Sequence, residues 1–199
     1  MENSQSKTNF LEKRVEFYNA LLKDKTYITT TEKIAHQIIN TYKNSGTVYC
    51  VGNGGSQCQS SHFATELLVR YTPNSRRPSI PSTSLSSDSS IITACANDFS
   101  FEEIFSNQIS AFATTRDMFI FFSTSGKSQN IIKAIDTARA IVEPTQVALI
   151  LGNHIPEKYK DYLCNVVSAS YSASTALIQE FHLFTVHSIC EILERNWND

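Results

Sequence analysis

The spacing of apolar positions changes near residue 47. Before it, apolar residues recur at helical spacing in two groups, one between Phe10 and Leu22 and the other between Ile34 and Tyr42. The stretch Thr29-Thr-Thr-Glu-Lys33 has the residues of a capping start, so the second helix is expected to begin there. The pattern predicts an extension of N-terminal helices over residues 1–45.

After residue 47, short apolar runs alternate with helical segments. Five runs have the length of strands: Thr47–Val51, Ser79–Leu85, Met118–Phe122, Gln146–Leu151 and Cys164–Val167. Such alternation is typical of βαβ units, in which helices cover both faces of a parallel sheet. A last helix follows Ser174, and its apolar residues spread around much of its circumference, as in a helix buried at an oligomer interface. We predict one α/β domain over residues 1–199, with its core and last helix in 46–199.

Composition narrows the range of partners. The 199 residues carry a formal net charge of −2, and the 17 basic residues are scattered, so neither nucleic acid nor a membrane surface is expected as a partner. The polar start and the short apolar runs indicate a cytoplasmic protein. Five cysteines without CxxC spacing argue against disulfides and a thiolate zinc site. The stretch 74–78 is expected to be a surface loop, because its two arginines are too few for a nucleic-acid patch.

The first candidate site is the loop Gly52-Asn-Gly-Gly-Ser56, between a strand and a helix. In an open α/β sheet, ligands bind outside the carboxyl ends of the strands. A dinucleotide loop needs glycine where Gln57 stands, and no acidic residue ends the next strand. A nicotinamide or flavin dinucleotide is therefore not expected.

The second candidate site is the loop Ser123-Thr-Ser-Gly-Lys-Ser128, between another strand and helix. It ends like a phosphate-binding P-loop, but Phe121 stands where the upstream glycine belongs. Four hydroxyls and the N–H groups of a helix start suit a monoester phosphate. The alternative is that these residues only cap the helix. Two such loops at neighbouring strand ends favour a ligand site.

The helix that follows the first loop carries His62 and Glu66, which share one face because they are four residues apart. Taken alone, they are as consistent with a surface pair. Because their helix starts at the expected ligand, they can also line its pocket. A carboxylate and a histidine suit the proton transfers of aldose–ketose isomerisation.

Five separated motifs, in order, resemble the phosphoheptose isomerase family of the sugar isomerase (SIS) superfamily. They are Asn53-Gly-Gly-Ser56, His62-Phe-Ala-x-Glu66, Asn97-Asp-Phe99, Ser123-Thr-Ser-Gly-x-Ser128, and Ile178-Gln-Glu-x-His182 with His187. The resemblance runs from about Val48 to Leu193. It implies a five-stranded parallel sheet in a flavodoxin-like three-layer sandwich. It also implies conversion of sedoheptulose 7-phosphate to D-glycero-D-manno-heptose 7-phosphate, the first step toward ADP-heptose for lipopolysaccharide.

The resemblance also implies roles for individual residues. Glu66 and His187 correspond to the acid/base pair, and a zinc ion, one per subunit, corresponds to His62, Glu66, Gln179 and His187. The residues that correspond to substrate contacts are Asn53, Gly54, Gly55, Ser56, Glu66, Asn97, Asp98, Ser123, Thr124, Ser125, Ser128 and Gln179. Segment 152–177 departs from the family, since it lacks the usual glycine pair and has Leu177 where an arginine is common.

Helix geometry adds an expectation about subunits. Gln179 and His187 are eight residues apart, which is about 12 Å along one helix and about 80° around it. We therefore expect one site to take them from different subunits of a homotetramer. His182 is expected to be a buried, hydrogen-bonded residue, and Glu180 either tunes the site or faces solvent.

Three other readings stay open. A non-catalytic SIS adaptor that binds the bacterial replication initiator resembles this fold without the residues that match Glu66 and His187. A sugar-phosphate sensing module needs neither residue. An isomerase of another phosphosugar, such as arabinose 5-phosphate, is the third.

Overall fold

The computed structural model describes residues 9–152, 154–159, 165–169 and 174–197. Five parallel strands form one sheet in the order β2-β1-β3-β4-β5. They are β1 (Val48–Gly52), β2 (Ser82–Ser84), β3 (Met118–Ser123), β4 (Val147–Leu151) and β5 (Asn165–Ser168). Each lies inside its predicted run or within one residue of it, which confirms the expected parallel sheet. Cys164 lies outside the described residues.

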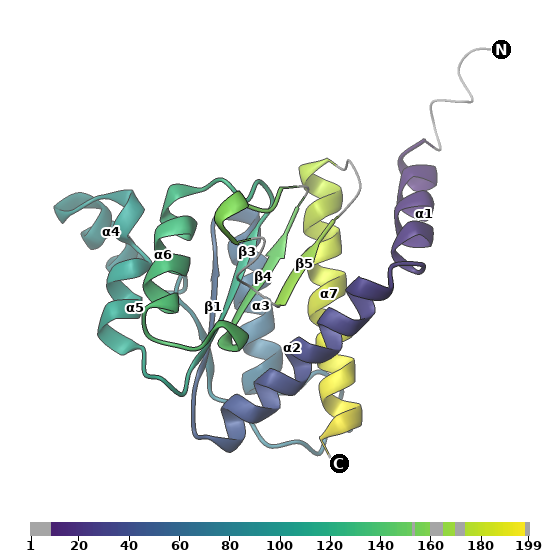
Figure 1. Cartoon of the computed structure of the whole chain (residues 1–199), viewed down its shortest axis with the longest axis horizontal. Helices are drawn as coiled ribbons and strands as arrows, with labels where there is room; N and C mark the ends of the chain where they lie inside the picture. Colours follow the sequence, from purple (N-terminus) through teal and green to yellow (C-terminus); the bar gives the residue numbers. More distant parts are fainter. Residues whose placement is uncertain (1–8, 153, 160–164, 170–173, 198–199) are drawn as a thin grey trace.

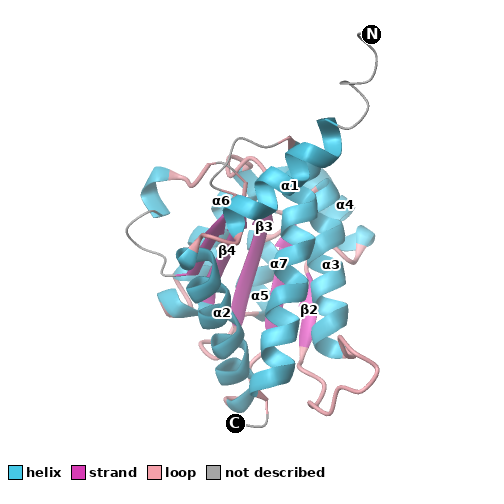
Figure 2. Ribbon diagram, turned by 90° about the vertical axis from the view of Figure 1, so that its right-hand side faces the viewer, coloured by secondary structure: helices cyan, strands magenta, loops and turns pink. Residues whose placement is uncertain are grey.

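Helices cover both faces of the sheet (Figure 1). One face carries α2 (Lys25–Lys43), α3 (Gly54–Leu68) and α7 (Thr175–Asn196). This is the face turned toward the viewer in Figure 2. The other face carries α5 (Ser106–Phe112) and α6 (Gln129–Arg139), with α4 (Ser89–Asp98) at the outer end of this layer. The helix α1 (Asn9–Leu21) extends away from the sheet, and the short 3-10 helices are η1 (Phe101–Glu103), η2 (Pro144–Gln146) and η3 (Glu157–Tyr159). This is the predicted three-layer α/β domain with an N-terminal helical extension.

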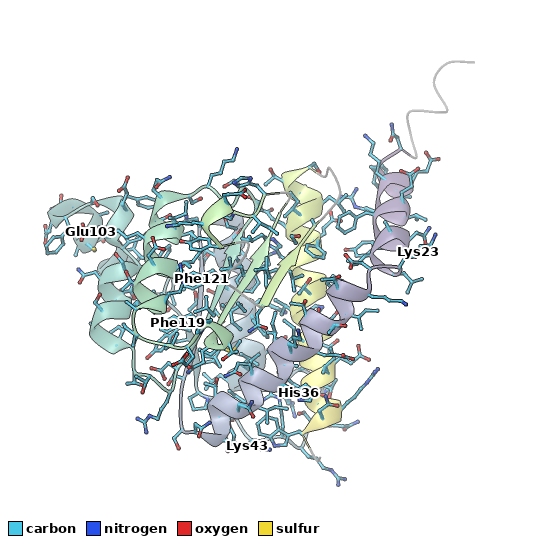
Figure 3. The ribbon with its side chains drawn as sticks, viewed as in Figure 1. Lys23, His36, Lys43, Glu103, Phe119 and Phe121 are labelled. Carbon is cyan, nitrogen blue, oxygen red and sulfur yellow. The ribbon has the colours of Figure 1, made fainter. Side chains whose placement is uncertain are left out.

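The central strand β3 shows why the core has two halves. All six of its residues are buried, and successive side chains point to opposite faces. Ile120 and Phe122 join the apolar cluster under α2, α3 and α7, whereas Phe119 and Phe121 join the cluster under α6 (Figure 3). A strand that packs helices on both faces reads as an unbroken apolar run, which is why its sequence predicted it well.

One helical expectation needs correction. The helix α2 begins at Lys25 rather than at Thr29, because the carboxylate of Asp24 accepts the N–H groups of Thr26 and Tyr27. The apolar residues of α7 pack largely against α2, α3 and the sheet of their own chain, and an oligomer interface on this helix stays a prediction. In the described part of the chain, no helix combines the length and apolar character needed to cross a membrane.

Candidate active site

Two loops leave the carboxyl edge of the sheet side by side. β1 ends at Gly52 and β3 at Ser123, and the parallel register pairs Gly52 with Phe122. The glycine loop (52–56) and the serine loop (123–128) therefore start from neighbouring strands. Their helices then diverge, since α3 packs on one face of the sheet and α6 on the other.

In both helices, the side chain of the N-cap residue leaves the backbone N–H groups uncapped. Elsewhere in the chain, the N-cap residues Asp24, Asp88 and Ser174 accept backbone N–H groups of α2, α4 and α7. Asn53 and Ser128 hold the same position before α3 and α6, but their side chains do not accept such N–H groups. The interpretation that Ser128 only caps its helix is therefore wrong. Helix starts left open in this way offer N–H groups and positive dipole ends to an anion.

The predicted contact residues of the two loops differ in exposure. Gly54 is exposed and Gly55 half-buried, whereas Ser56 is only 4% exposed. In the serine loop, Thr124 and Ser128 are half-buried. The Oγ of Ser123 accepts the Gly126 N–H at 3.1 Å, and the Oγ of Ser125 accepts the Lys127 N–H at 3.2 Å. These two hydroxyls thus shape the loop while keeping their own O–H groups as donors.

A cluster of three side chains forms where α3 and α7 pack against each other. The Nε2 atoms of His62 and His187 are 3.0 Å apart, and Nε2 of His62 lies 3.3 Å from Oε1 of Glu66. One ligand atom from each of the three residues lies within 4.8 Å of the others. The His62 side chain is 40% exposed and that of Glu66 17%. The cluster is thus open enough to meet a ligand and buried enough to position it.

The donor set fits a zinc ion. Two imidazole nitrogens and a carboxylate oxygen with a fourth position open are the ligands of a catalytic zinc site. Ligand atoms about 2.0–2.1 Å from a tetrahedral ion are about 3.3 Å from each other, close to the two separations in this cluster. Burial lowers the pKa of His187, and neighbouring His62 lowers it further, while Glu66 acts in the opposite direction. A neutral imidazole is the form that binds a metal or accepts a proton.

Gln179 lies elsewhere along the same pair of helices. A Cβ on Gly55 would be 2.0 Å from Nε2 of Gln179, so the carboxamide rests on the glycine loop. The Nε2 of Gln59 also donates to the Gln179 carbonyl at 3.4 Å. Gln179 contacts the start of α3, and His187, further along α7, contacts the middle of α3. The helices α3 and α7 therefore run in the same direction.

This parallel packing bears on the expectation about subunits. Within one chain, Gln179 contacts the start of α3 and His187 contacts its middle, so the two do not meet at one point; that a site takes them from different subunits stays a prediction. The eight-residue spacing separates them as calculated, but it sends them to different places along α3. The structure brings together three members of the predicted metal set and sets Gln179 against the glycine loop.

Other candidate residues have varied surroundings. Asn97 and Asp98 are exposed at the end of α4, where Nδ2 of Asn97 donates to Oδ1 of Asp98 at 2.8 Å. Their contact with substrate stays a prediction. Glu180, whose role was open, holds α1 through Arg14, whose Nε donates to Oε2 at 2.7 Å. His182 is fully buried as expected; the Leu151 carbonyl lies near its ring, but within the described residues neither ring nitrogen makes a hydrogen bond of ordinary geometry.

Sequence reasoning missed the structural role of segment 70–78. Arg77, expected in a surface loop, is only 8% exposed, and its guanidinium donates to the Leu67 carbonyl at 2.8 Å and to the Glu66 carbonyl. Thr72 donates its N–H and hydroxyl to Glu194 at 3.1 and 2.5 Å. The Tyr71 ring lies 5.6 Å from that of His187. The segment therefore secures the end of α3 and covers the histidine, which no local motif could indicate.

Known proteins resemble this chain in sequence over most of its length. A family model described as the SIS domain matches residues 10–145. Phosphoheptose isomerase from Leptospira biflexa is 40% identical over 158 residues, which cover 79% of this chain and 79% of that protein. Phosphoheptose isomerase from Burkholderia pseudomallei is 34% identical over 189 residues, 95% of this chain and 93% of that protein.

The fold also matches solved structures of phosphoheptose isomerases. A phosphoheptose isomerase from Francisella tularensis matches with a TM-score of 0.85 and 25% identity, covering 98% of this chain and 100% of that one. The enzyme from Neisseria gonorrhoeae matches with a TM-score of 0.81 and 25% identity, covering 94% and 96%. The matching sequences cover most of both chains and the matching folds nearly all. The chain therefore belongs to the phosphoheptose isomerase family of SIS-domain proteins.

Proposed function

We propose that this protein converts sedoheptulose 7-phosphate to D-glycero-D-manno-heptose 7-phosphate. The observation that carries the proposal is the cluster of His62, Glu66 and His187: the first two lie on α3, the helix that starts at the glycine loop, and His187 joins them from α7. A sugar phosphate is long enough to place its phosphate at the helix starts and its carbonyl end at the cluster. Relatives named phosphoheptose isomerase at 34–40% identity support this substrate.

The reaction moves a proton between neighbouring carbons. In the ketose, the carbonyl is at C2, so a base removes a proton from C1 and an acid returns one to C2 through an enediol. Glu66 and His187 are the proposed pair. The lowered pKa of His187 keeps its imidazole neutral near pH 7, ready to accept a proton. The partly buried Glu66 carboxylate is the second group that can exchange one.

The phosphate end is assigned to the two loops. The N–H groups at the starts of α3 and α6, with the hydroxyls of Thr124, Ser125 and Ser128, are the proposed donors. Gln179 is proposed to contact the sugar between phosphate and cluster, because its carboxamide lies on Gly55.

We further propose a zinc ion held by His62, Glu66 and His187. Gln179, the fourth residue of the predicted set, lies against Gly55 in its own chain, so it is proposed to complete a site of a neighbouring subunit. When bound, zinc polarises the carbonyl and stabilises negative charge on its oxygen. The chain's own residues still bind the phosphate, orient the sugar and move the proton.

A homotetramer in the cytoplasm, supplying heptose for lipopolysaccharide, completes the proposal. The N-terminal helices support an assembly in which residues 1–45 pack between subunits, since α1 and the residue after it expose apolar side chains: Phe10 57%, Leu11 53%, Val15 59% and Leu22 77%.

The test is incubation of the purified protein with sedoheptulose 7-phosphate, with and without a chelator, following the aldose product. We expect turnover in the wild type and strong losses in Glu66→Gln and His187→Ala. Absence of turnover in the wild type contradicts the proposal, as does full activity in either variant. Arabinose 5-phosphate and the replication initiator, tested in parallel, separate the rival isomerase and the adaptor.

A further inference from the structure

The glycine loop and the serine loop are joined by two asparagine side chains. Nδ2 of Asn53 donates to Oδ1 of Asn130 at 2.8 Å, and Nδ2 of Asn130 donates to Oδ1 of Asn53 at 2.9 Å. The two residues are 77 positions apart in the sequence, and Asn130 is only 3% exposed. Asn130 Oδ1 also accepts the Ile131 N–H at 2.9 Å, which fixes the orientation of its carboxamide.

This pair sits where the sheet no longer holds the two loops together. The strands β1 and β3 set the spacing of the loops only as far as Gly52 and Ser123. Beyond that point, α3 continues on one face of the sheet and α6 on the other. The paired carboxamides therefore link two helix starts across the edge of the sheet.

We propose that Asn53 and Asn130 form a clasp that sets the distance between the two helix starts, and that Asn130 is a positioning residue for sugar-phosphate binding. The inference rests on the proposed function for the identity of the ligand. Each polar atom of the Asn53 carboxamide makes one hydrogen bond to Asn130, which fixes its orientation and leaves its second N–H for the predicted substrate contact. The clasp also holds the backbone N–H groups of the two helix starts in register.

The clasp explains why α3 begins without a side-chain cap. An asparagine at the N-cap position normally accepts an N–H of its own helix. Asn53 is held by Asn130 instead, and its helix start remains open. A loose Asn53 can turn back onto α3 and occupy donors that the phosphate needs. Loss of Asn130 should therefore weaken phosphate binding in two ways. The distance between the two helix starts is no longer fixed, and the released Asn53 side chain competes with phosphate for the N–H groups of α3.

The experiment compares Asn130→Ala with Asn165→Ala. Asn165 is also 3% exposed, and its Nδ2 donates to the Thr145 carbonyl at 2.7 Å, at the opposite edge of the sheet. Both variants lose a buried carboxamide, so both should lower Tm. Only Asn130→Ala should raise KM for sedoheptulose 7-phosphate, by roughly ten- to hundredfold, with kcat within about threefold of the wild type.

Two further variants separate the clasp from general damage. Asn130→Asp keeps the acceptor for the Ile131 N–H but replaces the donor to Asn53 with a carboxylate oxygen and adds a negative charge beside the phosphate site, so it should raise KM at least as much as Asn130→Ala. If Asn130 acts through Asn53, Asn130→Ala should add little to KM in an Asn53→Ala background. A KM in Asn130→Ala no higher than in Asn165→Ala, or independent effects in the double variant, overturns the clasp.

Binding of inorganic phosphate, measured by calorimetry, keeps this test apart from that of the proposed function. The clasp predicts weaker phosphate binding in Asn130→Ala and unchanged binding in Asn165→Ala, whether or not the protein turns over the heptose. If the wild type is inactive on sedoheptulose 7-phosphate and this pattern holds, the proposed function fails and the clasp stands. Equal phosphate binding in both variants, or none in the wild type, overturns the clasp.

Discussion

The buried ring of His182 should make the protein less stable as the pH falls. The side chain is fully buried on α7, with its ring centroid 5.9 Å from that of Phe122 and 6.1 Å from that of Phe181. Burial lowers the pKa of His182 to about 4, and the nearby Leu151 carbonyl offsets this only in part. The folded protein therefore resists protonation of this imidazole.

The sign follows from the unfolded chain, where a histidine has a pKa of about 6.5. Between about 6.5 and about 4 the unfolded state binds the proton and the folded state does not, so stability is complete above this window and falls with pH inside it. The gap corresponds to about 3 kcal/mol, of which about 2 kcal/mol is lost by pH 5. This is a large part of the 5–15 kcal/mol, roughly, that stabilises a typical domain.

Urea unfolding of the wild type and His182→Leu at pH 7 and pH 5 measures the effect. The wild type should lose about 2 kcal/mol more than the variant between these values, because leucine cannot be protonated and leaves no unpaired nitrogen. His36→Leu, at an exposed position of α2 (Figure 3), serves as the control and should keep the wild-type pH dependence. Equal losses in the wild type and His182→Leu would refute the reasoning.

Two other substitutions test particular contacts. Arg77→Met removes the buried guanidinium that binds the carbonyls at the end of α3, and should lower the free energy of unfolding in urea by about 2–3 kcal/mol; an unchanged midpoint would contradict that role. Gly55→Ala places a methyl group 2.0 Å from Nε2 of Gln179, so it should displace that carboxamide and raise KM with little change in Tm. Wild-type KM in Gly55→Ala would show that Gln179 does not need its position on the glycine loop.

The sequence predicted the elements of the fold because their patterns are local. β3 and β4 are buried on both faces, so their sequences are unbroken apolar runs. The loops after β1 and β3 are indicated by their glycine and hydroxyl residues. The start of α2 was misplaced because one aspartate, Asp24, supplies a cap that no periodicity marks.

The site was predictable only as a set of residue types. That His187 meets His62 depends on the parallel packing of α3 and α7, a tertiary feature that neither helix reveals alone. The charge of Arg77 suggested exposure, yet hydrogen bonds to the carbonyls at the end of α3 compensate for its burial. The role of Asn130 could not be predicted, because its partner, Asn53, is 77 residues away in the sequence and no local pattern links them.

The central claim is proton transfer by Glu66 and His187, and isomerisation in D2O tests it most directly. Sedoheptulose 7-phosphate is incubated with the wild type or Glu66→Gln, and the product is followed by NMR. We predict that the wild type forms an aldose carrying solvent deuterium at C2, and that Glu66→Gln forms it about 10²–10⁴ times more slowly with its fold intact. An aldose without deuterium would mean that the same hydrogen passes from C1 to C2, as a hydride or on one base shielded from solvent. It would contradict the account, as would wild-type turnover in Glu66→Gln.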